Sequence, residues 1–223
     1  ASVVVFPLDV TDPGSVHRLG EALAKDGIDI FIQNAAARMP SDQPPSAYAR
    51  TVYETNNLGT RRVVETFLPL TRRRFLIVAS SFGRLVHVAP KIRPLFDAPR
   101  DADALDESLE GYVSAVERGE TLADWPDWIN IPSKIHQVAL GRLVAPTATA
   151  RVNSLCPGLV DTDASRPWFK DMSNAQTPDA AAAHILRLAL LPVGHPDEPP
   201  PGALVQFNKV LPWNEDEAAS NNT

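Results

Sequence analysis

The feature that most constrains the fold is a regular alternation of short apolar runs with longer segments of helical periodicity. The apolar runs occupy residues 1–10, 28–37, 75–83, 150–162 and 202–210. The segments with helical spacing occupy 12–27, 46–73, 104–119, a stretch from about 131, and 177–191. Continuous apolar strands that alternate with helices are typical of a parallel sheet covered on both faces. We predict an α/β protein with one domain over 1–213 and a polar, frayed tail over 214–223.

The composition limits the classes of partner. A chain of 223 residues suits one domain with a substantial core, and its net charge of −6 offers no attraction to nucleic acid or to anionic membranes. No apolar stretch approaches the length of a membrane span. The single cysteine, Cys156, excludes an internal disulfide, fits a reducing cytoplasm and sits in an apolar run, as a buried structural thiol would. The five histidines follow no metal-binding spacing. We therefore expect a cytoplasmic protein without a metal and with no nucleic-acid or membrane partner.

Polar side chains gather where the predicted strands end. Apolar runs are followed by Asp9, Asn34, Ser80, Ser81 and the segment 157–162. The carboxyl ends of parallel strands meet at one edge of the sheet, which is where such folds place their sites. The sequence therefore predicts a site at that edge, unless these residues only mark the points at which the strands leave the core.

Five segments, taken in order, carry a family resemblance. They are LDVTD at 8–12, QNAAA at 33–37, TNNLGT at 55–60, VASSFG at 78–83 and CPGLVDT at 156–162. An insertion at 90–128, with a Trp-Pro pair near its end, adds to them. No single segment is specific, but together and at this spacing they resemble the short-chain dehydrogenase/reductase family, above all its carbonyl-reductase members. The resemblance implies a Rossmann-like doubly wound parallel sheet.

The resemblance also implies roles for several side chains. Ser81 would orient a substrate carbonyl, Lys134 would bind the nicotinamide ribose, and Asn56 would hold a relay water or take a purely structural place in its helix. The residues expected to bind an NADP or NAD cofactor are Asp9, Asn34, Ala35, Lys134, Pro157, Gly158 and Thr162. Gln33 and Ala36 depart from the family pattern. The implied reaction moves a hydride between a nicotinamide dinucleotide and a small carbonyl or alcohol substrate.

One departure from the family concerns its paired tyrosine and lysine. The family places a tyrosine four residues before the lysine, so that one helical turn brings the phenol to the ammonium, which lowers the phenol's pKa. Here Asn130 stands four residues before Lys134, and none of the three tyrosines lies nearby. Asn130 can donate a hydrogen bond to a carbonyl but cannot transfer a proton. We expect Asn130 either to serve the site or to cap the helix ahead of Pro132.

A second departure is the glycine-rich phosphate turn, which the family carries near its start and which this sequence lacks. The first two strands are missing with it, so the resemblance implies an N-terminally truncated fold. The strand at 1–10 would then lose its hydrogen-bonding neighbours, and the run at 28–37 would form an exposed edge. We expect a partner that supplies strands, a rearrangement that places these two strands side by side, or poor solubility.

Three hypotheses for function remain. The first is an oxidoreductase of the family's kind, with Asn130 or a water in place of the phenol. The second is a binding or regulatory protein that kept the fold and lost the chemistry. The third is a hydride-independent isomerase or cyclase, in which Ser81, Asn130 and Lys134 polarise a carbonyl. Family members often pair through the helices that match 46–73 and 131–145, so the resemblance also implies a homodimer or homotetramer.

Overall fold

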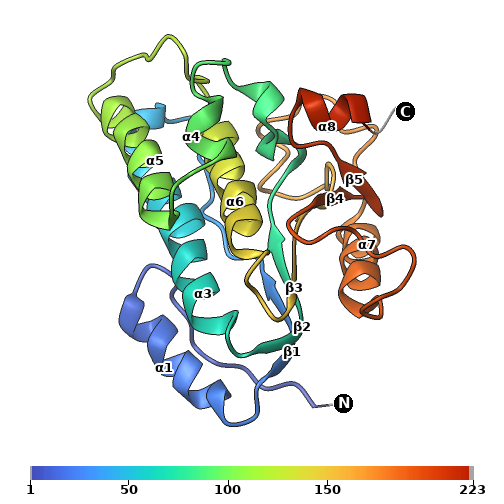
Figure 1. The fold of residues 1–223 in the computed structure, drawn as a ribbon. Coiled ribbons are helices and arrows are strands. Elements are labelled where there is room, and N and C mark those ends of the chain that lie inside the picture. Colours follow the sequence, from blue (N-terminus) through green and yellow to red (C-terminus); the bar gives the residue numbers. More distant parts are fainter. Residues whose placement is uncertain (1, 221–223) are drawn as a thin grey trace.

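A five-stranded sheet forms the centre of the structure (Figure 1). The computed structural model describes residues 2–220. The strands, in both chain order and spatial order, are β1 Ile28–Gln33, β2 Thr71–Val78, β3 Arg151–Cys156, β4 Leu204–Gln206 and β5 Lys209–Leu211. The first four are parallel, and β5 is antiparallel to β4. The predicted α/β fold with a mostly parallel sheet is confirmed.

Helices pack on both faces of this sheet. They are α1 Pro13–Ala24, α2 Ala49–Val52, α3 Gly59–Phe67, α4 Arg93–Asp97, α5 Ala102–Glu117, α6 Asn130–Val144, α7 Pro178–Leu190 and α8 Glu215–Ser220. Three 3₁₀ turns, η1 Pro45–Ala47, η3 Ser81–Gly83 and η4 Leu85–His87, accompany them, and the π-helical segment η2 Tyr53–Leu58 joins α2 to α3. Alternate side chains of β2 serve the two faces: Phe75 and Ile77 pack with α3 and α6, whereas Leu76 packs with α7.

The ends of α1 follow signals that the sequence carries. The side chain of Asp12 accepts a hydrogen bond from the Gly14 amide at 2.8 Å and so caps the first turn, with Pro13 directly after it. The chain leaves the helix at Gly27, whose φ of 68° is a conformation that glycine adopts without strain. This turn feeds the chain directly into β1.

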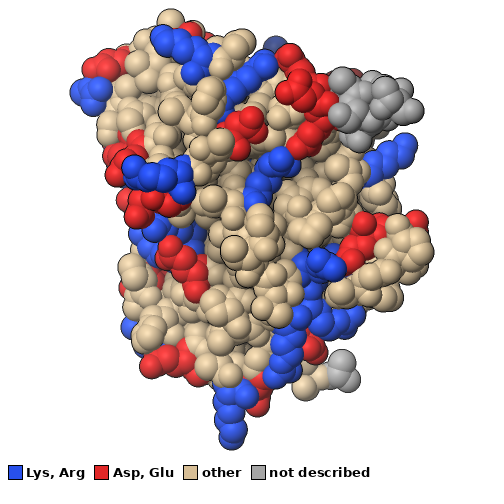
Figure 2. Space-filling view, viewed as in Figure 1, with Lys and Arg blue, Asp and Glu red and all other residues tan. Residues whose placement is uncertain are grey.

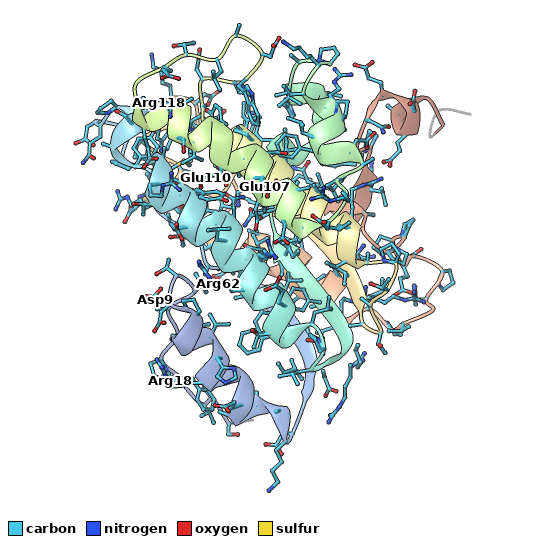
Figure 3. All side chains as sticks on the ribbon, turned by 60° about the vertical axis from the view of Figure 1, so that its left-hand side comes forward. Asp9, Arg18, Arg62, Glu107, Glu110 and Arg118 are labelled. Carbon is cyan, nitrogen blue, oxygen red and sulfur yellow. The ribbon has the colours of Figure 1, made fainter. Side chains whose placement is uncertain are left out.

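Helix α5 lies over neighbouring helices rather than over the sheet, as Figure 3 shows around Glu110. It packs against α6 and α2. Arg50 on α2 forms ion pairs with Glu110 and Glu117, each at 2.6 Å. Nearer the core, Asp106 lies 2.7 Å from Nε2 of His136 on α6. Helix α5 therefore covers part of both helical segments that the resemblance assigned to pairing between subunits.

The predicted first strand is wrong. Residues 2–9 form neither helix nor strand, and Val3 and Val5 are 89% and 87% exposed. Among the described strands only β2 pairs with β1, so the segment neither joins a ladder nor folds back beside β1 as the rearrangement would require. A run of β-branched residues forms a strand only where hydrogen-bonding neighbours exist, which is why local propensity fails here.

The C-terminal region also differs from the expectation. The single strand predicted over 202–210 is a hairpin, because Phe207 and Asn208 adopt φ of 49° and 62° and reverse the chain between β4 and β5. In the tail predicted to fray, Glu215–Ser220 form α8, and residues 221–223 lie outside the described part of the chain. Glu217 on α8 accepts a hydrogen bond from the Trp213 amide and forms an ion pair with Arg142, both at 2.8 Å. These contacts order a segment whose composition alone reads as disordered.

The surface of the described residues carries charges of both signs. Positive and negative side chains are interspersed on the face shown in Figure 2. No helix among residues 2–220 is long and apolar enough to cross a membrane. The described residues also contain no cluster of His, Cys, Asp and Glu that could hold a metal ion.

Candidate active site at the carboxyl ends of the strands

A cavity of about 410 Å³ opens at the carboxyl ends of β2 and β3. The loop after β2 contributes Ser80, Ser81 and Phe82, and Asn130 and Lys134 on the first turns of α6 close the far side. The loop after β3 contributes Pro157, Gly158, Leu159, Val160, Thr162, Ala164 and Ser165. The edge of the sheet at which the sequence predicted a site therefore carries a cavity that several of the predicted residues line.

One wall of the cavity is aromatic. The rings of Trp128 and Trp168 stack with centroids 5.3 Å apart, and Phe82 and Phe169 meet Trp128 edge-on. The indole nitrogen of Trp168 donates to the backbone oxygen of Met39 at 3.2 Å, which ties two distant segments into this wall. Sequence reasoning missed these residues, because Trp128 and Trp168 lie far apart in the chain and meet only in the fold.

Lys134 points its amine toward the cavity from the second turn of α6. Its side-chain nitrogen donates to Oε1 of Gln137 at 2.8 Å and to the backbone oxygen of Val78 at 3.3 Å. The residue is only 9% exposed. Burial disfavours the charged form and lowers the pKa of Lys134 to about 8.

A buried chain of hydrogen bonds fixes the partner of this lysine. Nε2 of Gln137 donates to the backbone oxygen of Asn56 at 2.8 Å and to Oγ1 of Thr60 at 3.0 Å. Nε2 of Gln33 donates to the same Thr60 oxygen at 3.2 Å. Because both acceptors hold the amide nitrogen of Gln137, its amide oxygen faces Lys134. Sequence reasoning missed Gln137, and its spacing of three residues from Lys134 is the one signal that could have indicated this pair.

Asn56 has a structural place. It lies in the π-helical segment η2, is buried, and does not line the cavity. Its side-chain oxygen accepts a hydrogen bond from the Ala37 amide at 2.7 Å, which anchors the loop after β1. Its backbone oxygen accepts hydrogen bonds from Nε2 of Gln137 and from the hydroxyl of Thr60. Asn56 thus acts on the site through Gln137.

Asn130 does not cap its helix, which corrects one of the two expectations for it. The residue in the cap position is Ile129, and no side chain caps the first turn. The backbone of Ile129 already has helical dihedral angles, and the Ile131 amide donates to the backbone oxygen of Trp128. The helical turn therefore starts before Asn130, which lies inside it. Asn130 lines the cavity one helical turn before Lys134. Among the described residues its amide has no hydrogen-bond partner.

Ser81 begins the short helical turn η3 that follows β2. The side chain of Ser80 caps this turn by accepting from the Phe82 amide at 3.2 Å. Ser81 lines the cavity, and its hydroxyl has no hydrogen-bond partner among residues 2–220. Its backbone oxygen lies 3.2 Å from Nε2 of His87, and burial lowers the pKa of that imidazole. The Ser81 hydroxyl is therefore available to a ligand.

Three of the predicted cofactor residues line the cavity together with Lys134: Pro157, Gly158 and Thr162. Gly158 has φ of 83°, and a Cβ built there would lie 2.5 Å from Cζ of Phe207 and 2.8 Å from Nε2 of Gln176. Only glycine fits this position without displacement of a neighbour. The loop after β3 therefore packs closely on Phe207 and Gln176 at this glycine.

The other predicted cofactor residues lie elsewhere. Asn34 and Ala35 are exposed directly after β1, and neither lines the cavity. Asp9 lies in the exposed segment before α1, beside Arg62 in Figure 3. Its carboxylate accepts hydrogen bonds from the Thr11 hydroxyl and amide at 2.7 and 2.8 Å, which lower the pKa of Asp9. Asp9 ends no strand because residues 2–9 form none, so its predicted place at a strand end is wrong.

Comparison with curated proteins finds carbonyl reductases. Mouse "Carbonyl reductase [NADPH] 1" is 30% identical over 224 residues, which cover 92% of this chain and 78% of that protein. The human protein of the same name is 28% identical over 227 residues, with the same coverage. No family model matches the sequence.

Comparison with solved structures supports the same fold. Salutaridine reductase from Papaver somniferum superposes with a TM-score of 0.70 at 21% identity, over 86% of this chain and 80% of that one. NADPH-bound carbonyl reductase from chicken fatty liver superposes with a TM-score of 0.62 at 18% identity, over 94% and 74%. The relatives found by sequence and the superposed structures all carry names of reductases. The chain therefore belongs to the short-chain dehydrogenase/reductase family, as a carbonyl-reductase-like member.

Proposed function

We propose that the chain reduces small carbonyl compounds with NADPH in the cavity at the carboxyl ends of β2 and β3. The observation that carries the proposal is the convergence of Lys134, Ser81 and Asn130 on one apolar cavity. The relatives reported above carry the name of a carbonyl reductase that uses NADPH. These names favour reduction over the regulatory and hydride-independent alternatives.

The residues present fit the nicotinamide end of a dinucleotide. Pro157, Gly158 and Thr162 line the cavity beside Lys134 and would lie around a flat ring there. The close approach of Gly158 to Phe207 and Gln176 fixes the loop that carries the first three. When bound, the cofactor supplies the hydride. Asp9, Asn34 and Ala35, the other residues expected to bind the cofactor, lie outside the cavity, so the support comes from the nicotinamide end.

The chain's own residues would orient and complete the reaction. The Ser81 hydroxyl and the Asn130 amide donate hydrogen bonds to the carbonyl oxygen and stabilise the charge that develops there. An amide does not release a proton near neutral pH, so Asn130 cannot act as the acid. The ammonium of Lys134, with a pKa of about 8, is the acid best matched to neutral pH and supplies the proton to the alkoxide.

The shape of the site favours flat carbonyl substrates. Trp128 and Trp168 form a stacked pair along one wall, and such faces bind aromatic or conjugated rings by offset stacking. We propose aromatic and conjugated aldehydes and ketones as the substrate class. Association of subunits would have to use a surface other than the helix faces that α5 covers.

Steady-state oxidation of NADPH with a panel of aromatic aldehydes and ketones tests the proposal. Wild type should turn over at least one of them, and Lys134→Met should lower kcat by about 10²-fold or more, as expected for loss of an acid. Lys91→Met is the matched control, because Lys91 is an exposed lysine paired with Asp124, and its kcat should not change. Equal turnover by wild type and Lys134→Met, or none by wild type across the panel, would contradict the proposal.

A further inference from the structure

We propose that Lys134 is also an amine nucleophile, and that the cavity captures aromatic and conjugated aldehydes as an imine on its side-chain nitrogen. This activity goes beyond reduction, because it uses neither a dinucleotide nor a hydride. The observations that carry it are the charges around Lys134, the number of its hydrogen-bond acceptors and the apolar wall opposite.

The first observation concerns charge. Among the described residues that line the cavity, Lys134 is the only one with a charged side chain, and none of them carries a carboxylate. Its two recorded partners, the amide of Gln137 and the backbone of Val78, are neutral. The titratable neighbours are the thiol of Cys156 on β3, which lines the same cavity, and His87, which contacts Ser81. A buried ammonium without a counter-ion favours its neutral form.

The second observation concerns hydrogen-bond capacity. An ammonium has three N–H donors, whereas a neutral amine has two donors and one lone pair. Within residues 2–220 the nitrogen of Lys134 has two acceptors, Gln137 Oε1 and Val78 O. The neutral amine satisfies both and keeps its lone pair for a ligand. The charged form would leave one donor without a protein partner.

The third observation concerns the chemistry of the surroundings. The lone pair of Lys134 attacks the carbonyl carbon, the π electrons move to oxygen, and a proton passes from nitrogen to that oxygen to give a carbinolamine. Loss of the hydroxyl with the remaining N–H proton releases water and leaves the C=N bond. The unpartnered side chains of Ser81 and Asn130 can hydrogen-bond the oxygen that leaves, and an apolar cavity favours loss of water. The stacked pair Trp128–Trp168 suits an aromatic aldehyde.

Reductive trapping tests the proposal on the protein itself. Wild type is incubated with 2-naphthaldehyde and sodium cyanoborohydride at pH 8 without nucleotide, and labelled lysines are located by mass mapping of chymotryptic peptides. The other four lysines, Lys25, Lys91, Lys170 and Lys209, are exposed and serve as internal references. Lys134 should be labelled first, about 10-fold faster than the references, because much more of its amine is neutral at this pH. If the labelling rates instead rank with the exposure of each lysine, so that Lys134 is the slowest, the proposal is overturned.

Two further arms exclude a trivial result. 2-Naphthalenemethanol, which has the same ring system but no carbonyl, should slow labelling at Lys134 and leave the exposed lysines unchanged. Lys134→Arg should lose the fast site, whereas Lys91→Arg should keep it. If Lys134→Arg fails to fold, the site map and the competition on wild type decide. Failure of NADPH oxidation leaves this experiment interpretable, because trapping uses no nucleotide. Failure of trapping leaves the reductase proposal untouched, because hydride transfer from NADPH needs no imine.

Discussion

The side-chain nitrogen of Lys134 donates a hydrogen bond to the amide oxygen of Gln137, three residues along α6, at 2.8 Å. The amide nitrogen of Gln137 is held by Asn56 and Thr60, so its oxygen cannot turn away. The position of the one charged group in the cavity therefore depends on the π-helical segment behind it. This arrangement links a helix irregularity to the chemistry of the site.

Replacement of Gln137 by leucine should lower the pKa of Lys134 below its wild-type value of about 8. The substitution removes an acceptor that stabilises the ammonium and adds apolar surface around it. Titration of the lysine Cε resonance by NMR measures the change. Gln43→Leu, at an exposed position, is the control and should leave the titration unaltered. An unchanged pKa in Gln137→Leu would show that this hydrogen bond does not govern the lysine.

The stability of the fold should rise with pH because of Lys134. Its folded-state pKa of about 8 lies below the ordinary 10.5. Between these values the unfolded chain binds a proton that the folded chain does not, so unfolding becomes less favourable as pH increases, by on the order of 3 kcal/mol in total. In Lys134→Met this gain should disappear.

Urea unfolding at pH 7 and at about pH 10 measures this difference. The advantage of Lys134→Met over wild type should be larger at the lower pH. Lys91→Met should show no such dependence, because Lys91 is exposed. A stability difference between wild type and Lys134→Met that is the same at both pH values would contradict a buried, readily deprotonated lysine.

Gly158→Ala and Gly111→Ala should have opposite effects on stability. At Gly158 the backbone has φ of 83° and a new methyl group would meet Phe207 and Gln176, so we expect a loss of about 1–3 kcal/mol. At Gly111, inside α5, a methyl group meets nothing within 4 Å, and alanine should stabilise the helix by about 0.5–1 kcal/mol. Thermal unfolding of both variants measures the two changes in stability. A Gly158→Ala variant as stable as wild type would argue against the close packing of Gly158 on Phe207 and Gln176.

Asp106→Asn should detach α5 from the helices beneath it. Burial alone would raise the pKa of Asp106, but hydrogen bonds from His136 and Arg61 hold the pKa below its ordinary value. Its contribution to stability is thus present above about pH 4 and lost as the pH falls. Removal of the charge should cost about 3 kcal/mol near neutral pH.

Denaturant unfolding at pH 7 and pH 3 tests this claim. The difference between wild type and Asp106→Asn should shrink at the lower pH. Glu107→Gln, on the exposed side of the same helix, should change little at either pH. If Asp106→Asn and Glu107→Gln change the free energy of unfolding equally, the contacts of Asp106 with His136 and Arg61 contribute no more than a surface charge.

Local sequence patterns predicted those helices and strands whose local preference agrees with their tertiary contacts. Continuous apolar runs indicated β1 to β3, and signals such as Asp12 before Pro13 indicated where a helix begins. The same patterns predicted a strand at 1–10, where the propensity is strong but no neighbour exists to pair with it. The hairpin at Phe207 depends on two residues with positive φ, neither of which is glycine, so its turn carries no conventional signal.

The site was predictable where motif and architecture agree. Ser81, Lys134 and Thr162 follow strands or open a helix, so their place at one edge of the sheet follows from topology. Gln137 lies on the same helix as Lys134, but its role depends on acceptors that another helix supplies. Trp168 meets Trp128 through a loop with no regular structure. Such contacts require the fold itself.

The most direct test of carbonyl reduction in this cavity is the rate of NADPH oxidation with an aromatic aldehyde by Asn130→Tyr and wild type. Asn130 lines the cavity one helical turn before Lys134, so a phenol there would lie beside the ammonium and supply a second acid. We predict a rate about 10²-fold or more above wild type, with Asn174→Tyr, at an exposed position, equal to wild type. A folded Asn130→Tyr that oxidises NADPH no faster than wild type would contradict the account.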